Sequence, residues 1–468
     1  QDFENLREEC LSQGVLFEDK TFPPGVESIG RALLSEEQLR NLTWKRPVDL
    51  HRHPQLYVKG ASRFDIKQGS VVKGDCWFLA ALGSLTCHDH HLEWILPKNQ
   101  GFSKDYAGIF HFRFWHFGQW ADVVIDDRLP MNGERYLFVS PRQSNEFWPA
   151  LLEKAYAKLC GSYQHIDGGN IADALVDFTG GIKKDIYLKK KPMEKVWEMM
   201  KRSDKLKCLM AAGIAGGTNR VLAKGLVEGH AYSVTGIAQV DYKGRTERLI
   251  RLWNPWGQEE WKGRWSDEAV QWERISKEEQ DNLNKKKEDG EFWMALQDFR
   301  DYFNGLVISD ANPEFMFSDN RQKWMVRTYE NGWVAGVSAG GNHPQLSRPT
   351  FLKNPQYKLQ LKKPDPESNR KQYYNVTVSL IQKPNRQGSG PHGISIVLHK
   401  EPRDRWPEEL QHESREGYLS HPLNQPKYTL EREISCKFIL EPGTYVLIPC
   451  TNKAEQEAGF ILRVFYRK

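Results

Sequence analysis

"VVKGDCWFLAALGSL", residues 71–85, is the stretch that decides how this chain begins to fold and where its chemistry could lie. Gly74 and Asp75 precede Cys76, and the run from Trp77 to Leu85 is mostly apolar. This pattern predicts a buried helix that begins at the cysteine. A thiol at a helix N-terminus is stabilised as thiolate by the helix dipole and by free N–H groups. Taken alone, however, a cysteine in this position is more often a structural core residue than a nucleophile.

The composition is that of a folded protein with more than one domain. The chain has 468 residues, 39% of them apolar and 27% charged, so two or three domains are expected. No apolar run approaches the roughly 20 residues that a membrane span needs, and the polar first residues are not typical of a signal peptide. The seven cysteines are odd in number, scattered and without a C-x-x-C pair. This usage favours a reducing, cytoplasmic setting.

The pattern along the chain predicts an α+β core followed by an all-β domain. Residues 3–96 are expected to be helix and loop, residues 108–127 a β-hairpin, and residues 144–163 a helix that Asn145 could cap and that ends near Gly161. A boundary is expected at "DFTGGI" (177–182), followed by a helix near 193–202 and strands within 207–257. Beyond residue 312, short alternating strands predict a β-sandwich. The expected domains are residues 1–181, 182–311 and 312–468.

Charge is distributed unevenly between these parts. Residues 312–468 hold 23 Lys and Arg against 16 Asp and Glu, whereas residues 1–311 hold 43 against 45. A mildly basic last domain is typical of a solvated surface, and a weak contact with acidic phospholipid membranes stays open. No basic stripe with interleaved aromatic residues indicates nucleic-acid binding.

Two residues far along the chain could complete a nucleophilic site with Cys76. His230 in "LVEGHAYSVTG" starts a predicted strand, and Asn254 in "RLWNPWG" ends another. The order of a Cys, a distant His and then an Asn is that of papain-like proteases. An imidazole can take the thiol proton, and an Asn carbonyl can hold that imidazole in the productive tautomer. Each residue alone has an ordinary structural explanation, but the combination is much more specific.

The chain resembles the calpains, the calcium-dependent intracellular cysteine proteases, in six stretches: "GDCWFLAALGSLT", "FWPALLEKAYAKL", "DFTGGI", "GHAYSVTG", "WNPWGQEEWKGRWSD" and "EDGEFWM". The resemblance covers nearly the whole chain and implies a papain-like, two-lobed protease core followed by a C2-like β-sandwich. It implies that Cys76 is the nucleophile, His230 the general base and Asn254 its orienting partner. Trp256 matches the tryptophan that shields this pair from water and that holds the lobes apart in resting calpains.

The resemblance also implies one calcium (Ca2+) site in each lobe. In the first lobe the matching ligands are the carbonyls of Val58 and Gly60 and the carboxylates of Asp65 and Glu146. In the second lobe they are Glu260, Asp267, Asp289 and Glu291, with the carbonyl of Lys287. Arg63 matches the arginine that pairs across the lobes with Glu291 once calcium is bound. Oxygen ligands suit calcium, but neither set has the spacing of an EF-hand loop, and "KKEDGE" alone would be interpreted as a solvated acidic turn.

The chain departs from the calpain pattern at the oxyanion donor. Calpains have a glutamine six residues before the nucleophile, in Gln-Gly-x-x-Gly-Asp-Cys, whereas in "QGSVVKGDC" Gln68 lies eight residues before Cys76. An oxyanion donor must lie about 3 Å from the developing charge, and its loss costs about 10²–10³ in rate. Either the loop bulges and Gln68 still reaches the oxyanion, or activity is impaired. The insertion also follows Asp65, which puts the coupling to calcium in question.

The last domain departs from the pattern as well. No penta-EF-hand module, through which classical calpains bind a small subunit, is expected within this chain, and "LKKPDPESNRK" (361–371) is basic where the best-known calpains are acidic. The resemblance implies a calcium-dependent endopeptidase that makes limited cuts in protein substrates. Two alternatives stay open. The displaced Gln68 favours a catalytically impaired, calcium-responsive scaffold, and a transglutaminase-like acyl transferase would normally have Asp where Asn254 stands.

Overall fold

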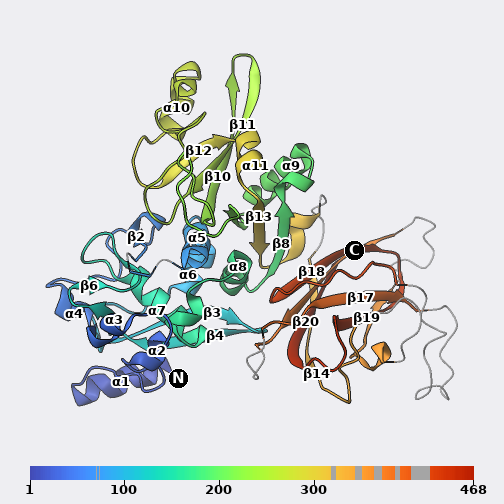
Figure 1. Ribbon diagram of the computed structural model, residues 1–468, viewed down its shortest axis with the longest axis horizontal. Coiled ribbons are helices and arrows are strands. Elements are labelled where there is room, and N and C mark those ends of the chain that lie inside the picture. Colours follow the sequence, from blue (N-terminus) through green and yellow to red (C-terminus); the bar gives the residue numbers. More distant parts are fainter. Residues whose placement is uncertain are drawn as a thin grey trace. The chain divides into compact units, whose positions relative to one another are not determined.

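The computed structural model divides the chain into two compact units (Figure 1). The structure describes residues 1–69, 71–72, 74–317, 323–342, 350–362, 372–384, 390–401 and 422–467. Unit 1 is Gln1–His116 with Trp120–Ala311, and unit 2 is Phe117–Gln119 with Asn312–Lys468. Unit 1 mixes helices and sheets and unit 2 is built on strands, which confirms the predicted α+β class. The basic stretch at 363–371 lies outside the described residues, as do Ser70 and Lys73 of the insertion.

The first lobe of unit 1 is mainly helical, with small sheets. Its helices are α1 (Phe3–Gln13), α2 (Val26–Ile29), α3 (Glu36–Arg40), α4 (Pro47–Leu50), η1 (Arg63–Asp65), α5 (Cys76–Leu85), α6 (Asp89–Ile95), α7 (Trp148–Cys160), η2 (Tyr163–Ile166) and α8 (Ile171–Thr179). Its strands are β1 (Leu42–Lys45), β2 (Ile66–Lys67), β3 (Ile109–His116), β4 (Gln119–Asp126), β5 (Leu129–Asn132), β6 (Arg135–Tyr136) and β7 (Ser140–Pro141). The expectation of helix and loop alone up to residue 96 is wrong in detail. Strands β1 and β2 fall in that range because they pair with β5 and β7, far along the chain.

Helix α5 is the centre of this lobe. It begins at Cys76, as the sequence predicts, and every residue from Trp77 to Leu85 is buried. The helix packs against α8 and against strands of the second lobe (Figure 1). A Cβ atom at Gly83 would collide with Ser233 and Trp253, so only glycine allows α5 to approach the second lobe this closely.

Helix α7 crosses the same core and is buried on nearly all sides. Its buried residues include the charged Glu153 and Lys154. Pro149 stands in its first turn, where its missing N–H costs nothing, and Gly161 ends it with a φ of +114°. The expected cap at Asn145 is wrong, because the N-cap residue is Phe147. The carbonyl of Asn145 instead accepts a hydrogen bond of 2.7 Å from the N–H of Gln55, which ties this loop to an earlier one.

The second lobe is built on a six-stranded antiparallel sheet in the order β12-β11-β10-β9-β13-β8. Its strands are β8 (Ile182–Tyr187), β9 (Leu209–Gly213), β10 (Ala231–Tyr242), β11 (Arg245–Trp253), β12 (Glu291–Ala295) and β13 (Gly305–Asp310). Its helices are η3 (Leu188–Lys190), α9 (Met193–Lys205), η4 (Val270–Arg274), α10 (Lys277–Leu283) and α11 (Leu296–Tyr302). Trp253 and Val307 of this sheet belong to the same apolar cluster as α5 and α7, so the two lobes share one core.

Unit 2 is a β-sandwich, as predicted. One sheet has the order β14-β20-β16-β18 and the other β15-β19-β17. The elements are η5 (Pro313–Met316), β14 (Met325–Trp333), η6 (Phe351–Lys353), β15 (Tyr357–Leu361), β16 (Tyr374–Gln382), β17 (Ile394–Lys400), β18 (Glu433–Leu440), β19 (Gly443–Thr451) and β20 (Ala458–Arg467). Alternate residues of both sheets, such as Val376, Val378, Ile396 and Leu462, form its apolar core.

The expectations about the cysteines and about membrane-spanning helices can be compared with the described residues. All seven cysteines are free thiols in the structure. A search of the helices in the described ranges finds none with the length and apolar character that a membrane crossing requires.

Candidate active site

Cys76 is the first residue of α5, and its thiol is half-buried. Burial raises the pKa of the Cys76 thiol to about 11, and the negative charge of Asp75 acts in the same direction. The backbone N–H of Ala231, together with those of Trp77 and Cys76 at the helix start, acts in the opposite direction. The thiol is therefore protonated here, whereas a helix N-terminus alone predicted a thiolate. A base is needed to remove its proton.

The candidate base, His230, lies beside Asn254. His230 directly precedes β10 and Asn254 directly follows β11, and these strands are neighbours in the sheet. Nε2 of His230 lies 2.7 Å from Oδ1 of Asn254. The Asn254 amide nitrogen donates to the carbonyls of Gln258 and Glu259 at 2.9 and 3.2 Å, so its oxygen faces the imidazole. The proton of neutral His230 is thereby assigned to Nε2, which leaves Nδ1 as the acceptor.

Burial lowers the pKa of His230 to about 4, and the hydrogen bond with Asn254 only partly offsets this effect. The imidazole is therefore neutral near pH 7 and able to accept a proton. Trp256 covers the pair: the centroids of its ring and of the His230 ring are 4.7 Å apart. Its backbone N–H also donates to Oδ1 of Asn254 at 3.0 Å, so the Asn-Pro-Trp turn fixes Asn254 from its own backbone. In this structure Trp256 lies over His230 while the lobes are packed together.

The two lobes meet at the nucleophile. The N–H of Ala231, the residue after His230, interacts with the Cys76 sulfur. Further along the same interface, the hydroxyl of Ser233 donates to the carbonyl of Ala80 at 2.5 Å. The start of α5 thus lies against the start of β10, and the two chemically complementary residues come from different lobes.

Gln68 lies just after β2 and is buried. Its amide nitrogen donates a hydrogen bond of 2.8 Å to Oδ1 of Asp75, the residue before the nucleophile. The two extra residues of the insertion therefore do not separate Gln68 from the start of α5.

Arg63 and Glu291 form a bridge between the lobes. Nε and Nη2 of Arg63, in η1, lie 2.6 and 2.9 Å from the two carboxylate oxygens of Glu291, at the start of β12. Such a bidentate pair fixes geometry as well as charge. Glu291 is also held from its own lobe by Arg251 at 3.3 Å and by the Thr235 hydroxyl at 3.2 Å.

The first-lobe acidic set brings Asp65 and Glu146 together. Burial, together with the adjacent Asp65 carboxyl, raises the pKa of Glu146 to about 7. The N–H of Val58 donates to one Glu146 oxygen at 2.7 Å, whereas the other oxygen is buried with no hydrogen-bond partner among the described residues. Asp65 accepts from the N–H of Ser62 at 2.7 Å and from the Trp148 indole at 3.0 Å. Gly60 lies in the same loop.

The second-lobe acidic set brings Glu260 and Asp267 together. Burial, together with the adjacent Asp267 carboxyl, raises the pKa of Glu260 to about 8. The loop that contains Lys287 and Asp289 wraps around both. The N–H groups of Asp289 and Gly290 donate to Glu260 at 3.0 and 2.9 Å, and that of Lys287 donates to Asp267 at 3.2 Å.

Both sets are suited to a cation in the same way. In each, two buried or half-buried carboxyl groups lie close enough for one to raise the pKa of the other, and hard oxygen ligands are those that calcium prefers. Across the described part of the chain, no group of three or more His, Cys, Asp and Glu side chains could hold a metal ion by itself. Backbone carbonyls, as expected for Val58, Gly60 and Lys287, would have to complete either site. Glu291 is engaged with Arg63 rather than with Glu260.

Three charged residues around the site were not predicted from the sequence. Arg142, in the first lobe, donates to the carbonyl of Ile66, and its guanidinium occupies the space that a Cβ atom of Gly257 would need. Both Asp289 and Asp65 attract its charge. No motif announces this arginine. Asp75 and Glu153 were missed as a buried carboxyl pair, although a Glu-Lys pair within the apolar "PALLEKAYAKL" is an unusual signal.

Together, a thiol at a helix start, a neutral imidazole oriented by an Asn amide and two packed lobes define a two-lobed, papain-like cysteine protease. A family model described as "Calpain family cysteine protease" matches residues 17–310, and one described as "Calpain large subunit, domain III" matches residues 329–465. The chain therefore belongs to the calpain family.

Similar proteins agree with this assignment. The chain is 44% identical to Calpain-14 of Homo sapiens, with 100% of this chain and 68% of that protein covered. It is 40% identical to Calpain-8 of Rattus norvegicus, again over 100% and 68%, and 40% identical to the Calpain-1 catalytic subunit of Homo sapiens, over 100% and 67%. The protein is thus a calpain-type cysteine peptidase, and the match favours peptide hydrolysis over acyl transfer to an amine.

Proposed function

We propose that this peptidase is calcium-dependent and makes limited cuts in protein substrates, in the cytoplasm. The observation that carries the calcium dependence is that each lobe brings two carboxyl groups together, which raises the pKa of one of them and favours a positive charge beside the pair. Bound calcium would supply that positive charge to both sets. The free thiols support a reducing compartment.

The chain's own residues carry the hydrolysis. Nδ1 of His230 takes the proton from the Cys76 thiol as the sulfur attacks the scissile carbonyl carbon. The backbone N–H of Cys76 and the side-chain amide of Gln68 stabilise the oxyanion. The protonated His230 then gives its proton to the leaving amine as the peptide bond breaks, and a thioester remains on Cys76. Water, deprotonated by His230, hydrolyses the thioester and regenerates the thiol.

The second acidic set is connected directly to the orienting residue. The N–H of Asn254 donates to the carbonyl of Gly290 at 2.8 Å, and the Trp253 indole donates to the carbonyl of Asp289 at 3.1 Å. A Cβ atom at Gly290 would collide with the Asn254 carbonyl, so the loop and the Asn254 turn are in contact. Rearrangement of the 287–291 loop therefore moves Asn254. Through Glu291 and Arg63, the same loop reaches the first lobe.

The experiment is a calcium titration of peptide cleavage. Asp289→Ala should raise the calcium concentration for half-maximal activity by about tenfold, within the usual range of allosteric coupling. Asp281→Ala, an exposed acidic residue of the same lobe, is the matched control and should leave the curve unchanged. An unchanged curve for Asp289→Ala would remove the second site from the proposal. Cys76→Ser should abolish cleavage and leave calcium binding intact. Cleavage that persists in this variant would contradict its role, whereas an intact enzyme without activity would favour the scaffold alternative.

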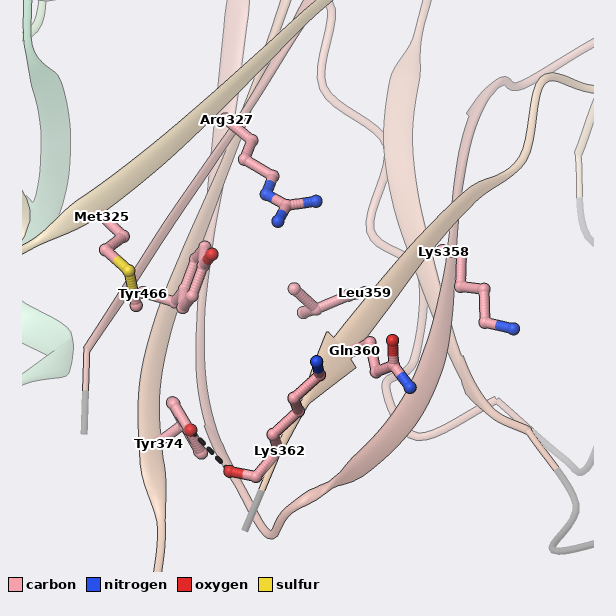
Figure 2. Close-up of a pocket in the computed structure, with 8 residues that line it drawn as sticks. All are labelled: Met325, Arg327, Lys358, Leu359, Gln360, Lys362, Tyr374 and Tyr466. Atoms are coloured by element: carbon pink, nitrogen blue, oxygen red, sulfur yellow. Dashed lines mark hydrogen bonds between the residues drawn. The ribbon is translucent and has the colours of Figure 1, made fainter. Parts of the chain in front are cut away.

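We also propose that unit 2 makes a weak contact with acidic phospholipid at a basic cleft of about 500 Å³. The cleft is lined by Met325, Arg327, Lys358, Leu359, Gln360, Lys362, Tyr374 and Tyr466, none of them acidic. Figure 2 shows Arg327 and Lys362 around this space, with the Tyr374 hydroxyl hydrogen-bonded to the carbonyl of Lys362. Arg327→Gln with Lys362→Gln should weaken cosedimentation with anionic vesicles several-fold, at about 1 kcal/mol per charge. Unchanged binding, or equal binding to neutral vesicles, would contradict this site.

A further inference from the structure

Arg142 joins the two lobes beside the turn that carries Asn254. It directly follows β7 in the first lobe, where its backbone N–H donates to the carbonyl of Asp65 at 3.4 Å. Its side chain is held on the same segment, because Nε and Nη2 donate to the carbonyl of Ile66 at 3.2 and 3.0 Å. These three hydrogen bonds fix the guanidinium to the part of the first lobe that leads from η1 into β2.

The guanidinium packs on Gly257 of the second lobe. A Cβ atom built on Gly257 would lie 2.0 Å from Nη2 and 2.8 Å from Nη1 of Arg142. Gly257 ends the Asn-Pro-Trp turn: its N–H donates to the carbonyl of Asn254 at 2.9 Å, and its φ is +71°. A side chain at this position would be strained and would displace the arginine. The missing Cβ thus lets an arginine of one lobe reach the turn that holds Asn254 in the other.

The same contact lies between the two acidic sets. Asp65 belongs to the first set and accepts the backbone hydrogen bond from Arg142. On the other side, a Cβ atom of Gly290 would lie 3.0 Å from Cα of Gly257, so the loop that carries Asp289 packs on the same turn. Both carboxylates attract the charge of the guanidinium.

The two attractions differ in what they stabilise. Asp65 is in the same lobe as Arg142 and is fixed to it through the backbone, so their attraction does not depend on how the lobes are packed. Asp289 and Gly257 belong to the other lobe, and Arg142 gains them only when the lobes are packed together. A group that interacts better with one arrangement shifts the equilibrium toward it. The charge of Arg142 therefore favours the arrangement in which the catalytic residues of the two lobes meet.

We propose that Arg142 is a positioning residue for peptide hydrolysis: its guanidinium, anchored to the carbonyl of Ile66, holds the Gly257 end of the Asn254 turn against the first lobe. Its loss should raise the calcium requirement and leave the catalytic groups themselves intact. Arg142 is exposed, so salt screens its charge and the expected effects are moderate. The calcium measurement below rests on the proposed calcium dependence, whereas the contact itself does not.

The test compares Arg142→Lys with Arg142→Met in the full chain. Lysine keeps the charge and can still donate to the carbonyl of Ile66, whereas methionine keeps a long side chain without charge. Arg142→Met should raise the half-maximal calcium concentration for peptide cleavage about threefold, with kcat at saturating calcium close to wild type. Arg142→Lys should restore most of this difference. The gap between the two variants should shrink as salt is raised from about 0.05 M to about 0.5 M.

A second measurement needs neither activity nor calcium. Hydrogen exchange is followed in calcium-free protein that carries Cys76→Ser and cannot digest itself. The amide N–H of Gly257 should exchange several-fold faster with Arg142→Met than with Arg142 or Arg142→Lys, because the turn has lost its contact with the first lobe. Arg135→Met, at an exposed arginine of β6 in the same lobe, is the matched control and should change neither measurement.

The positioning role is overturned if the Lys and Met variants have the same calcium midpoint, or if the exchange of Gly257 is equal in all variants. A lower midpoint in Arg142→Met would also overturn it, because the charge would then repel calcium more than it holds the lobes. If Arg142→Met fails to fold, Arg142→Gln takes its place with the same expectations. Wild-type protein that cleaves no peptide at any calcium concentration would instead overturn the proposed function, and the exchange of Gly257 would still decide the role of Arg142.

Discussion

The Cys76–His230–Asn254 site and the two acidic sets lie in the same unit but are completed in opposite ways. At the catalytic site, the Asn254 amide is fully engaged by backbone groups and by His230, and nothing needs to be added. In the acidic sets, Glu146 has a buried oxygen without a partner among the described residues, and the pKa of Glu260 is raised by burial and by Asp267. The side chains of the catalytic site are thus held in place by neighbouring groups of the protein, whereas the acidic loops gain stability from a positive charge that neutralises their carboxyl groups.

This difference indicates where regulation can act. A site whose parts come from two lobes is active only when the lobes are aligned, and alignment responds to anything that binds one arrangement better. The acidic loops are joined to the catalytic residues through Gly290 and Asn254 in one lobe and through Arg63 across the lobes. Mutations at the catalytic site should therefore change rate, and mutations at the acidic loops should change the calcium requirement.

The largest expected effect is at Asn254. Asn254→Ala removes the acceptor that holds the Nε2 proton of His230, so the imidazole can rotate or change tautomer. We expect kcat to fall by about 10²-fold or more, in the range of general-base catalysis, with the midpoint of the calcium curve unchanged. Peptide cleavage measured over a calcium series checks both quantities.

The control for this change is another Asn of the same lobe. Asn304 accepts a hydrogen bond from the N–H of Ala215 at 2.6 Å and does not contact His230, so Asn304→Ala should leave kcat near wild type. A shift of the calcium midpoint in Asn254→Ala, with kcat preserved, would contradict the separation between the two regions.

Much of the fold could be predicted because it is encoded locally. The apolar run after Cys76, the alternation in residues 108–127 and the short strands beyond residue 312 predict α5, the β3–β4 hairpin and the sandwich. Features that depend on distant partners could not be predicted. The strand β1 exists because it pairs with β5, and α7 starts at Trp148 because Asn145 is tied to Gln55.

The residues of the candidate site also fall into two groups, those that the local sequence predicts and those that depend on distant partners. The candidate nucleophile, base and orienting residue were predicted from their order and from their Gly- and Trp-rich surroundings. Their ionisation was predicted less well, because the helix start favours a thiolate but burial, which no local pattern reveals, outweighs it at Cys76. The acidic ligand sets and the role of Arg63 came from family resemblance rather than spacing. Arg142 lies in a loop with no signal, and only the packing of the lobes gives it neighbours.

A smaller effect is expected at the bridge between the lobes. Arg63→Ala removes the bidentate contact with Glu291 that joins the two lobes, so we expect their packed arrangement to lose part of its stabilisation. Glu291 keeps Arg251 and Thr235 and is not left unpaired, which limits the damage to folding. We expect the half-maximal calcium concentration to rise about fivefold, with kcat at saturating calcium close to wild type.

Arg251→Ala is the matched comparison, because Arg251 contacts the same carboxylate from within the second lobe. If the bridge matters because it joins two lobes, Arg63→Ala should shift the calcium curve more than Arg251→Ala does. Equal shifts would mean that either arginine merely neutralises Glu291. In that case closure would depend on other contacts between the lobes. The next contacts to test by mutation are Ser233 with Ala80 and Arg142 beside Gly257.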